Sequence, residues 1–217
     1  MRNEKGANMR VVIFGSTGGI GRQLVKQALA RGHAVRAFAR NPAQLEIKHA
    51  NLQTVQGDVM DIASVEQALQ GQEAVVSALG TPALTKNTVR SEGTRNIVRA
   101  MEKVGVCRLV CLSSLGVGDS RDMLPIHYKY ILVPFLLRQG FAEHELQEEF
   151  VKQSRTDWII VRPGAFTNGS RTGLYRHGFS VTDKTINAKI SRADVADFMV
   201  KQLTDATYIR KTPGVSY

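Results

Sequence analysis

The chain has 217 residues, of which 43% are hydrophobic and 22% charged, a composition typical of a globular domain and unlike that of a disordered segment. Its longest apolar run, residues 130–137, contains a proline and is much shorter than the roughly 20 residues that a membrane span needs. Residues 1–8 are polar, so we expect a disordered lead-in without a secretory signal, followed by one domain over residues 9–217 of a cytoplasmic protein.

The net charge of +10 is unevenly distributed, because residues 1–50 contain nine Lys or Arg side chains against two acidic ones. Such an excess attracts either small anions or a nucleic acid. The sequence contains no helix-turn-helix pattern, zinc-ligand spacing or RNA-binding aromatic motif. The charge therefore favours small anionic molecules, and we expect no nucleic-acid partner and no metal site.

Apolar runs of strand length alternate with stretches of helical period along the chain. We expect strands at residues 10–15, 33–40, 51–58, 73–80, 107–114 and 157–164. Helical spacing follows the first strand, Asp61 is placed to cap a helix at 61–70, and an apolar stripe runs from Val89 to Val104. Strands that alternate with helices through short connections predict an α/β fold, a single Rossmann-like, doubly wound parallel sheet with helices on both faces.

The two cysteines, Cys107 and Cys111, lie in the same predicted strand. Four strand steps place them about 13 Å apart, which is beyond the roughly 7 Å limit for a disulfide. We expect both thiols to be reduced and Cys111 to lie in the core.

Residues 10–21, RVVIFGSTGGIG, place glycines at a junction between a strand and a helix. Gly15 permits the tight turn, Gly18 allows the backbone to approach a pyrophosphate, and Gly21 allows close packing of helix on strand. The N-terminus of the following helix offers free N–H groups and partial positive charge to phosphates. The pattern predicts a dinucleotide site; the alternative is that the glycines serve only the turn.

Arg40 ends the second predicted strand, nineteen residues after Gly21. NAD sites usually hold an acid near this position, whereas a guanidinium can pair with the 2′-phosphate of NADP. Arg40 therefore favours NADP(H), although a solvated charge at a strand end is the alternative. Asp58 follows the third strand, where it is placed either beside the adenine or as a cap of the next turn.

Seven short segments occur in the order and spacing of a known family: GSTGGIG, FARNP, GDVMD, SALGT, SEGTRNIV, LSSLG and VRPG. The chain thus resembles the atypical short-chain dehydrogenase/reductases, above all their flavin reductase and biliverdin reductase branch, over about residues 9–205. The resemblance implies one Rossmann domain with a small substrate lobe, drawn here mainly from residues 115–145 and 164–190. It also implies cofactor contacts at Gly15, Ser16, Thr17, Gly18, Gly19, Ile20, Gly21, Arg40, Asp58, Val59, Ala78, Leu79, Gly80, Thr81, Leu112, Ser113 and Pro163.

Most members of the wider superfamily use a Tyr-x-x-x-Lys pair on the helix after the fifth strand. By this resemblance the lysine position falls on His144 and the tyrosine position on Gly140, so the pair is absent. The reductase branch instead has a serine and a histidine that match Ser113 and His144, which we expect to be catalytic. Glu148 lies one helical turn from His144 and predicts a raised pKa and an imidazolium. The alternatives are a strand-end hydroxyl bonded to the backbone for Ser113 and a surface ion pair for His144.

The branch has a second histidine after the sixth strand, and this chain has Ala165 there, followed by Phe166, which can form an aromatic wall. Arg171 and Arg176 are placed to meet a flavin phosphate or bilin propionates, with a solvated loop as the alternative. The apolar segment 122–141 is suited either to an open pocket or to a partner interface.

The resemblance implies an NADPH-dependent oxidoreductase that transfers hydride to a planar anionic acceptor, such as FMN, a bilin or a quinone-like molecule. Such a protein would be a monomer or a weak homo-oligomer. Loss of the Tyr–Lys pair is also what an NADP(H)-binding redox sensor or assembly factor of the NmrA-like type would show. An epimerase or dehydratase with different acid–base residues is a third possibility.

Overall fold

A computed structural model of the chain describes residues 8–80, 87–123, 137–183 and 185–217. Three parts of the sequence predictions lie outside these ranges: the lead-in up to residue 7, the expected cofactor contact Thr81, and most of the apolar segment 122–141.

The main sheet has eight strands in the order β3-β2-β1-β4-β5-β6-β10-β8. Neighbours run parallel as far as β10, which confirms the predicted doubly wound sheet. The strands are β1 (Arg10–Phe14), β2 (Ala34–Ala39), β3 (Leu52–Gln56), β4 (Ala74–Ser77), β5 (Arg108–Leu112), β6 (Asp157–Pro163), β8 (Arg176–His177) and β10 (Gly214–Ser216).

The edge strand β8 differs from the all-parallel prediction, because it pairs antiparallel with β10. Between β6 and β8 the chain forms only the short strand β7 (Ala165–Thr167) and a loop. A parallel strand needs a crossover, usually a helix, that returns the chain to the opposite edge of the sheet. Without a crossover, the chain re-enters the sheet from the carboxyl edge, so β8 runs antiparallel to β10.

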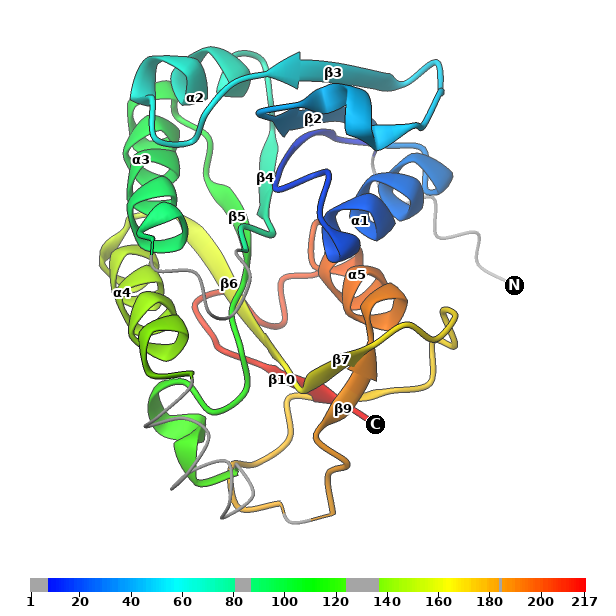
Figure 1. Ribbon diagram of the computed structural model, residues 1–217, viewed down its shortest axis with the longest axis vertical. Coiled ribbons are helices and arrows are strands. Elements are labelled where there is room, and N and C mark those ends of the chain that lie inside the picture. The colour runs from blue at the N-terminus through cyan, green and yellow to red at the C-terminus, as the bar shows by residue number, and fades with distance from the viewer. Residues whose placement is uncertain (1–7, 81–86, 124–136, 184) are drawn as a thin grey trace.

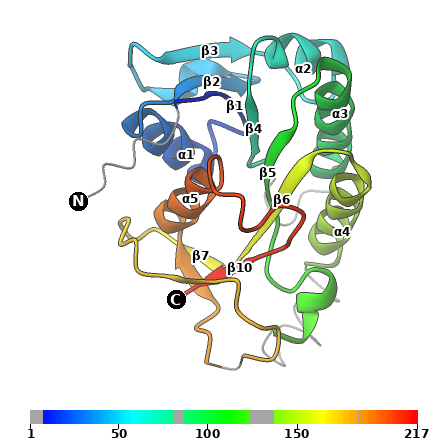
Figure 2. The same cartoon turned by 180° about the vertical axis from the view of Figure 1, so that it is seen from behind.

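Helices cover both faces of the sheet (Figure 1). Helices α1 (Gly19–Ala30) and α5 (Arg192–Lys201) pack together on one face. On the other face α3 lies between α2 and α4, an arrangement that Figure 2 shows from behind. Their bounds are Ile62–Leu69 for α2, Val89–Val104 for α3 and Arg138–Gln153 for α4.

Strand β1 is buried on both faces and divides the core into two apolar clusters. Val11 and Ile13 face the cluster under α1 and α5, whereas Val12 and Phe14 face the cluster under the other three helices. Each side chain of this kind contributes about 1.5–3 kcal/mol by leaving water. This burial explains why the strand reads as an uninterrupted apolar run in the sequence.

Local sequence signals determine where several helices begin and end. Asp61 caps α2 as predicted, since its carboxylate accepts a hydrogen bond from the backbone N–H of Ala63. Ser191 caps α5 by accepting from Asp194 N. Gly105 ends α3 in the left-handed conformation, with φ +83°.

Both cysteines are free thiols, Cys107 on the surface and Cys111 in the core, as the sequence predicts. The short strands β7 and β9 (Lys189–Ser191) form a separate parallel pair just before α5. The loop between β7 and β8 lies against α5. The assignment of residues 115–145 and 164–190 to a substrate lobe stays a prediction.

Candidate dinucleotide and acceptor cleft

A cleft with a volume of about 740 Å³ lies at the carboxyl edge of the main sheet. It is lined by the ends of β1, β2, β4 and β5. The strand order reverses between β1 and β4, and open α/β sheets bind ligands at such a switch point. The volume lies within the roughly 300–1,000 Å³ of small-molecule and cofactor sites.

The glycine loop forms one wall of the cleft, and two of its glycines are required by the backbone. Gly15 has φ +76°, and a Cβ there would lie 2.4 Å from the carbonyl oxygen of Ala78, the residue that follows β4. A Cβ on Gly21 would lie 2.0 Å from Gly15 O, so helix α1 can approach the strand only with glycine here. The structure thus explains these two positions by the turn and by packing.

The N-terminus of α1 has the properties that a phosphate site requires. Gly18 is its N-cap, no side chain caps it, and its first turn contains no acidic residue. The leading N–H groups are therefore free to donate into the cleft, and the helix adds partial positive charge. This wall fits the diphosphate of a dinucleotide.

Ser16 has a structural role that sequence reasoning missed. Its buried hydroxyl donates to Phe38 O at 3.0 Å and so ties the loop after β1 to β2, away from the cleft lining. Thr17 lines the cleft. The loop is therefore fixed through Ser16 while its other residues face the ligand space.

Arg40 and Asp58 both line the same end of the cleft, as the sequence predicts for the adenosine moiety. Arg40 is exposed and makes no hydrogen bond or ion pair to any described residue. Asp58 also caps its turn, because its Oδ1 accepts from Met60 N at 3.0 Å. The cap is thus one of the two roles that the sequence left open for Asp58, and its contact with the adenine stays a prediction.

Ser113 lines the opposite end of the cleft, where β5 ends. Its hydroxyl donates to Glu148 Oε1 at 2.7 Å, and not to the backbone. Glu148 is held in turn by Arg162, at 2.8 and 2.6 Å, and by Lys152 at 2.8 Å. Because the proton of Ser113 is committed to Glu148, its oxygen is left as a hydrogen-bond acceptor toward the cleft.

His144 also lines this end of the cleft, but its predicted charge is wrong. Burial and the nearby Arg90 cation lower the pKa of His144 to about 3, and these effects outweigh the attraction of Glu148. The carboxylate that was expected to raise the pKa is already neutralised by Arg162 and Lys152. His144 is a neutral imidazole at pH 7.

The tautomer of His144 follows from its hydrogen bonds. Gln147 Nε2 donates to Thr94 Oγ1 at 3.1 Å, so Gln147 Oε1 accepts from His144 Nδ1 at 3.1 Å. His144 Nε2 then carries a lone pair. This end of the cleft can accept a hydrogen bond from a ligand N–H, and it holds no tyrosine hydroxyl at the Gly140 position.

Phe166 lies in the cleft wall, as expected for an aromatic side of the pocket. The guanidinium of Arg192 lies over its ring at 5.5 Å from the centroid. Arg192 is the first residue of α5 and also contacts the glycine loop, since a Cβ on Gly19 would lie 3.0 Å from its Cδ. Sequence reasoning did not identify Arg192, because α5 joins the glycine loop only through the tertiary fold.

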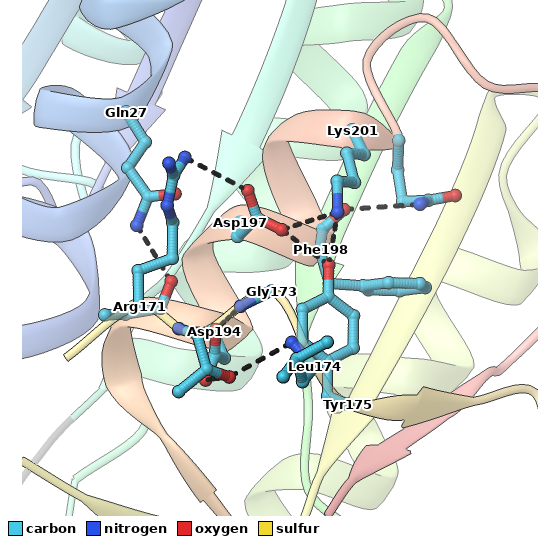
Figure 3. A network of polar contacts seen from close by, with 12 residues as sticks. Gln27, Arg171, Gly173, Leu174, Tyr175, Asp194, Asp197, Phe198 and Lys201 are labelled. Atoms are coloured by element: carbon cyan, nitrogen blue, oxygen red, sulfur yellow. Dashed lines mark hydrogen bonds and ion pairs between the residues drawn. The ribbon is translucent and has the colours of Figure 1, made fainter. Parts of the chain in front are cut away.

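The structure does not place Arg171 or Arg176 at the cleft, which corrects their assignment to the substrate pocket. Arg171 lies 3.5 Å from Asp197 Oδ1 in the network around α5 that Figure 3 shows. Arg176 pairs with Asp183 and donates to Thr185 Oγ1. Each of these two cations pairs with an acid of the chain, Arg171 with Asp197 on α5 and Arg176 with Asp183 in the loop after β8.

Most of the other predicted contacts meet in the cleft, with Ser16 and Pro163 outside its lining and Thr81 outside the described residues. Sequence reasoning missed a further set of lining residues, Phe38, Ala39, Asn41, Gln44, Gly57, Val89, Arg90, Ser114 and Arg192. Several of these residues are sequence neighbours of predicted contacts, and this adjacency is the sequence signal that could have identified them.

Comparison with known proteins gives one family and one fold. A family model described as NAD(P)H-binding matches residues 15–206. Photosystem II assembly factor Ycf39 of Synechocystis is 28% identical over 94% of this chain, which spans only 61% of that relative. No helix of the described residues is long and apolar enough to cross a bilayer.

Two solved structures share the fold. The oxidoreductase ylbE of Lactococcus lactis has a TM-score of 0.81 at 23% identity, covering 96% of this chain and 90% of that one. ChuY of Escherichia coli O157:H7, described as an anaerobillin reductase, has a TM-score of 0.76 at 24% identity, covering 95% and 96%.

Proposed function

The chain belongs to the NAD(P)H-binding family, and on that premise we propose that it is an NADPH-dependent reductase of a planar acceptor such as a flavin or a bilin. When bound, the dinucleotide supplies a hydride from its nicotinamide ring. The observation that carries the proposal is the acceptor end of the cleft, where Ser113 and neutral His144 stand without a Tyr–Lys pair.

Arg40 supports NADPH over NADH. It lines the cleft beside Asp58, is exposed and has no partner among the described residues, so its guanidinium is free to pair with a 2′-phosphate. The uncapped N-terminus of α1 binds the diphosphate through backbone N–H groups.

The chemistry of the cleft supports a ring acceptor over a simple ketone. Reduction of a ketone develops an alkoxide that needs a proton donor, and a histidine with a pKa of about 3 holds no spare proton at pH 7. A flavin or bilin spreads the incoming charge over its conjugated ring. The protein then needs chiefly to hold the two rings together, and such positioning can supply much of the rate.

We assign His144 and Ser113 to orientation of the bound molecules. His144 Nε2 accepts from a ring N–H of the acceptor, while Ser113 Oγ accepts from a ligand amide N–H. Phe166 supplies an apolar face against which a planar ring can stack. The proton that completes the reduction comes from solvent.

The proposal is tested by NADPH oxidation in the presence of FMN, riboflavin, biliverdin or a quinone. Wild type should oxidise NADPH in an acceptor-dependent way. Arg40→Glu should raise the KM for NADPH by about 10–100-fold, the loss expected for a charge-assisted contact turned into a repulsion. Absence of turnover with every acceptor, despite tight NADPH binding, would reject the reductase.

A second function, an NADP(H)-binding assembly factor or redox sensor, is favoured by the similarity to Ycf39 over 94% of this chain. It predicts tight nucleotide binding without turnover and a protein partner whose affinity depends on the NADPH/NADP⁺ ratio. Acceptor-dependent turnover by the purified protein alone would argue against it.

A further inference from the structure

Among the described residues, a buried arginine at the acceptor end of the cleft has few of the partners that buried arginines normally have. Arg90 lies in the first turn of α3, lines the cleft and is only 9% exposed. Its one hydrogen bond to a described residue is a long one, from Nη1 to Gly140 O at 3.5 Å. Its Nε is buried without any hydrogen-bond partner.

The charge of Arg90 is only partly compensated. Burial lowers the pKa of Arg90, but a guanidinium stays protonated at pH 7. Glu143 lies near enough to attract it, yet Glu143 Oε2 accepts instead from Ser91 N at 3.2 Å and Ser91 Oγ at 2.8 Å. A buried charge without a close acid among the described residues is costly, and a bound anion would compensate it.

Arg162 shows what a fully paired buried arginine looks like in the same protein. It is 1% exposed, and its guanidinium contacts both oxygens of Glu148 and a carboxylate oxygen of Asp119. Arg90 has no counterpart of either acid within ion-pair distance among the described residues. The contrast marks Arg90 as the cation whose donors remain available.

The position of Arg90 indicates which ligand it meets. It acts on the pKa of His144 and bonds to α4, so it belongs to the acceptor end and not to the end lined by Arg40. We propose that Arg90 binds an anionic oxygen group of the acceptor, a carboxylate or a phosphate. This inference rests on the proposed function and defines its substrate as an anionic planar molecule. It moves the anion contact from Arg171 and Arg176 to Arg90.

The guanidinium suits this task because it offers several donors in one plane, and carboxylates and phosphates accept two of them at once. With His144 neutral, Arg90 adds a positive charge at this end of the cleft, whereas the nearby cations Arg162 and Lys152 are already paired with Glu148. Arg90 therefore selects acceptors by charge, whereas Phe166 selects them by shape.

The test compares acceptors that differ only in the anionic group, measured as equilibrium binding to the NADP⁺-loaded protein. Wild type should bind biliverdin at least about tenfold more tightly than its dimethyl ester, and FMN more tightly than riboflavin. Arg90→Gln should remove whichever preference is present and leave NADP⁺ affinity unchanged. Arg99→Gln, an exposed position on the same helix, should change neither.

Each result decides between defined outcomes. A preference for the diacid alone identifies a carboxylate, and a preference for FMN alone identifies a phosphate. Equal binding of charged and uncharged forms to wild type, or loss of NADP⁺ affinity in Arg90→Gln, would overturn the inference. If Arg90→Gln does not fold, Arg90→Lys is the second variant. It keeps the charge but not the planar set of donors, and it should retain part of the preference for anionic acceptors.

The experiment separates this inference from the proposed function. Turnover of riboflavin or a quinone without any preference for anions would leave the reductase intact and reject the role of Arg90. Preferential binding of the diacid without turnover would reject the reductase and retain Arg90 as an anion site.

Discussion

Two groups of buried charges in this protein differ in how completely the chain neutralises them. In the α5 network, Asp197 is approached by Lys201 at 2.6 Å, Arg31 at 2.7 Å and the Tyr175 hydroxyl at 2.7 Å. Figure 3 shows Lys201 and Tyr175 beside Asp197. At the acceptor end of the cleft, Arg90 makes one hydrogen bond to the described part of the chain, at 3.5 Å. Charges that hold the fold are paired within the chain, and the charge facing the ligand space is left open.

The Glu148–Arg162 pair shares a feature with each of these two groups. It is as fully bonded as the α5 network, yet it also holds the hydroxyl of Ser113 at the cleft. The pair therefore fixes the direction of a site residue without meeting the ligand.

The comparison predicts that the α5 network contributes to stability and not to cofactor binding. Asp197→Ala should lower the free energy of unfolding by about 2 kcal/mol, because it removes a buried acid that accepts from the Tyr175 hydroxyl and pairs with the partly exposed cations Arg31 and Lys201. It should not change NADPH affinity. Urea unfolding and nucleotide titration at pH 7 measure the two effects. Asp205→Ala, at an exposed acid, is the control and should cost less than about 1 kcal/mol. An equal loss of unfolding free energy in Asp197→Ala and Asp205→Ala would contradict the stabilising role of the α5 network.

Acid should weaken the same network. Burial alone would raise the pKa values of Asp194 and Asp197, but hydrogen bonds hold both below their ordinary value of 3.8, and the charge of Lys201 lowers the pKa of Asp197 further. The unfolded chain therefore binds protons first as the pH falls, so the stabilisation is complete above about pH 5 and is lost through the lowered pKa values. The urea concentration at the unfolding midpoint, measured across pH, should decrease once the pH is lower than about 4. Asp197→Asn should flatten that fall; an unchanged acid slope in this variant would assign it to other carboxylates.

Arg192 offers a smaller effect at the cofactor side. Because its side chain contacts the glycine loop and lines the cleft, Arg192→Ala should raise the Kd for NADPH by about tenfold through loss of a charge-assisted hydrogen bond to phosphate. Arg192→Lys should restore part of the affinity. Calorimetric titration measures both. An unchanged Kd in Arg192→Ala would limit its role to packing on Phe166.

The last prediction is that the protonation state of His144 does not change near neutral pH. With a pKa of about 3, His144 should show no titration between about pH 5.5 and 8, whereas an ordinary histidine titrates near 6.5. NMR of the imidazole ring, assigned by comparison with His144→Gln, measures this directly. Removal of the Arg90 charge in Arg90→Gln should raise the pKa of His144. A midpoint near 6.5 in wild type would show that the imidazole is charged at mildly acidic pH and restore it as a proton donor.

Most of the residues that the sequence assigns to a cofactor do line the cleft, because that part of it is built from residues close together in the sequence or at neighbouring strand ends. Gly15 and Gly21 lie within one strand–turn–helix unit, so their spacing carries the geometry. Arg40 and Asp58 end strands of the same sheet, and parallel strands bring their carboxyl ends to one edge. Each prediction required only the order of strands and helices.

The acceptor side was predicted less well because its neighbours are distant in sequence. Arg90 comes from α3, His144 from α4 and Phe166 from the strand after β6, and their contacts depend on how helices pack. The position of Glu148 one turn from His144 suggested an imidazolium, but Arg162 on β6 neutralises that acid and Arg90 adds the opposite influence. The sequence predicts Arg171 as a ligand contact because its partner Asp197 is distant in sequence and reaches it only through the packing of α5.

By itself the sequence determined the doubly wound sheet, the glycine loop and the position of Arg40 at the end of the second strand, because apolar period, turn residues and strand order are local properties. Only the tertiary structure decided which charges are neutralised. The energy of a buried charge depends on partners that arrive from other elements and on how much water they exclude. For that reason Arg162 and Arg171 are held by the acids of their own fold, and Arg90 is left facing the cleft.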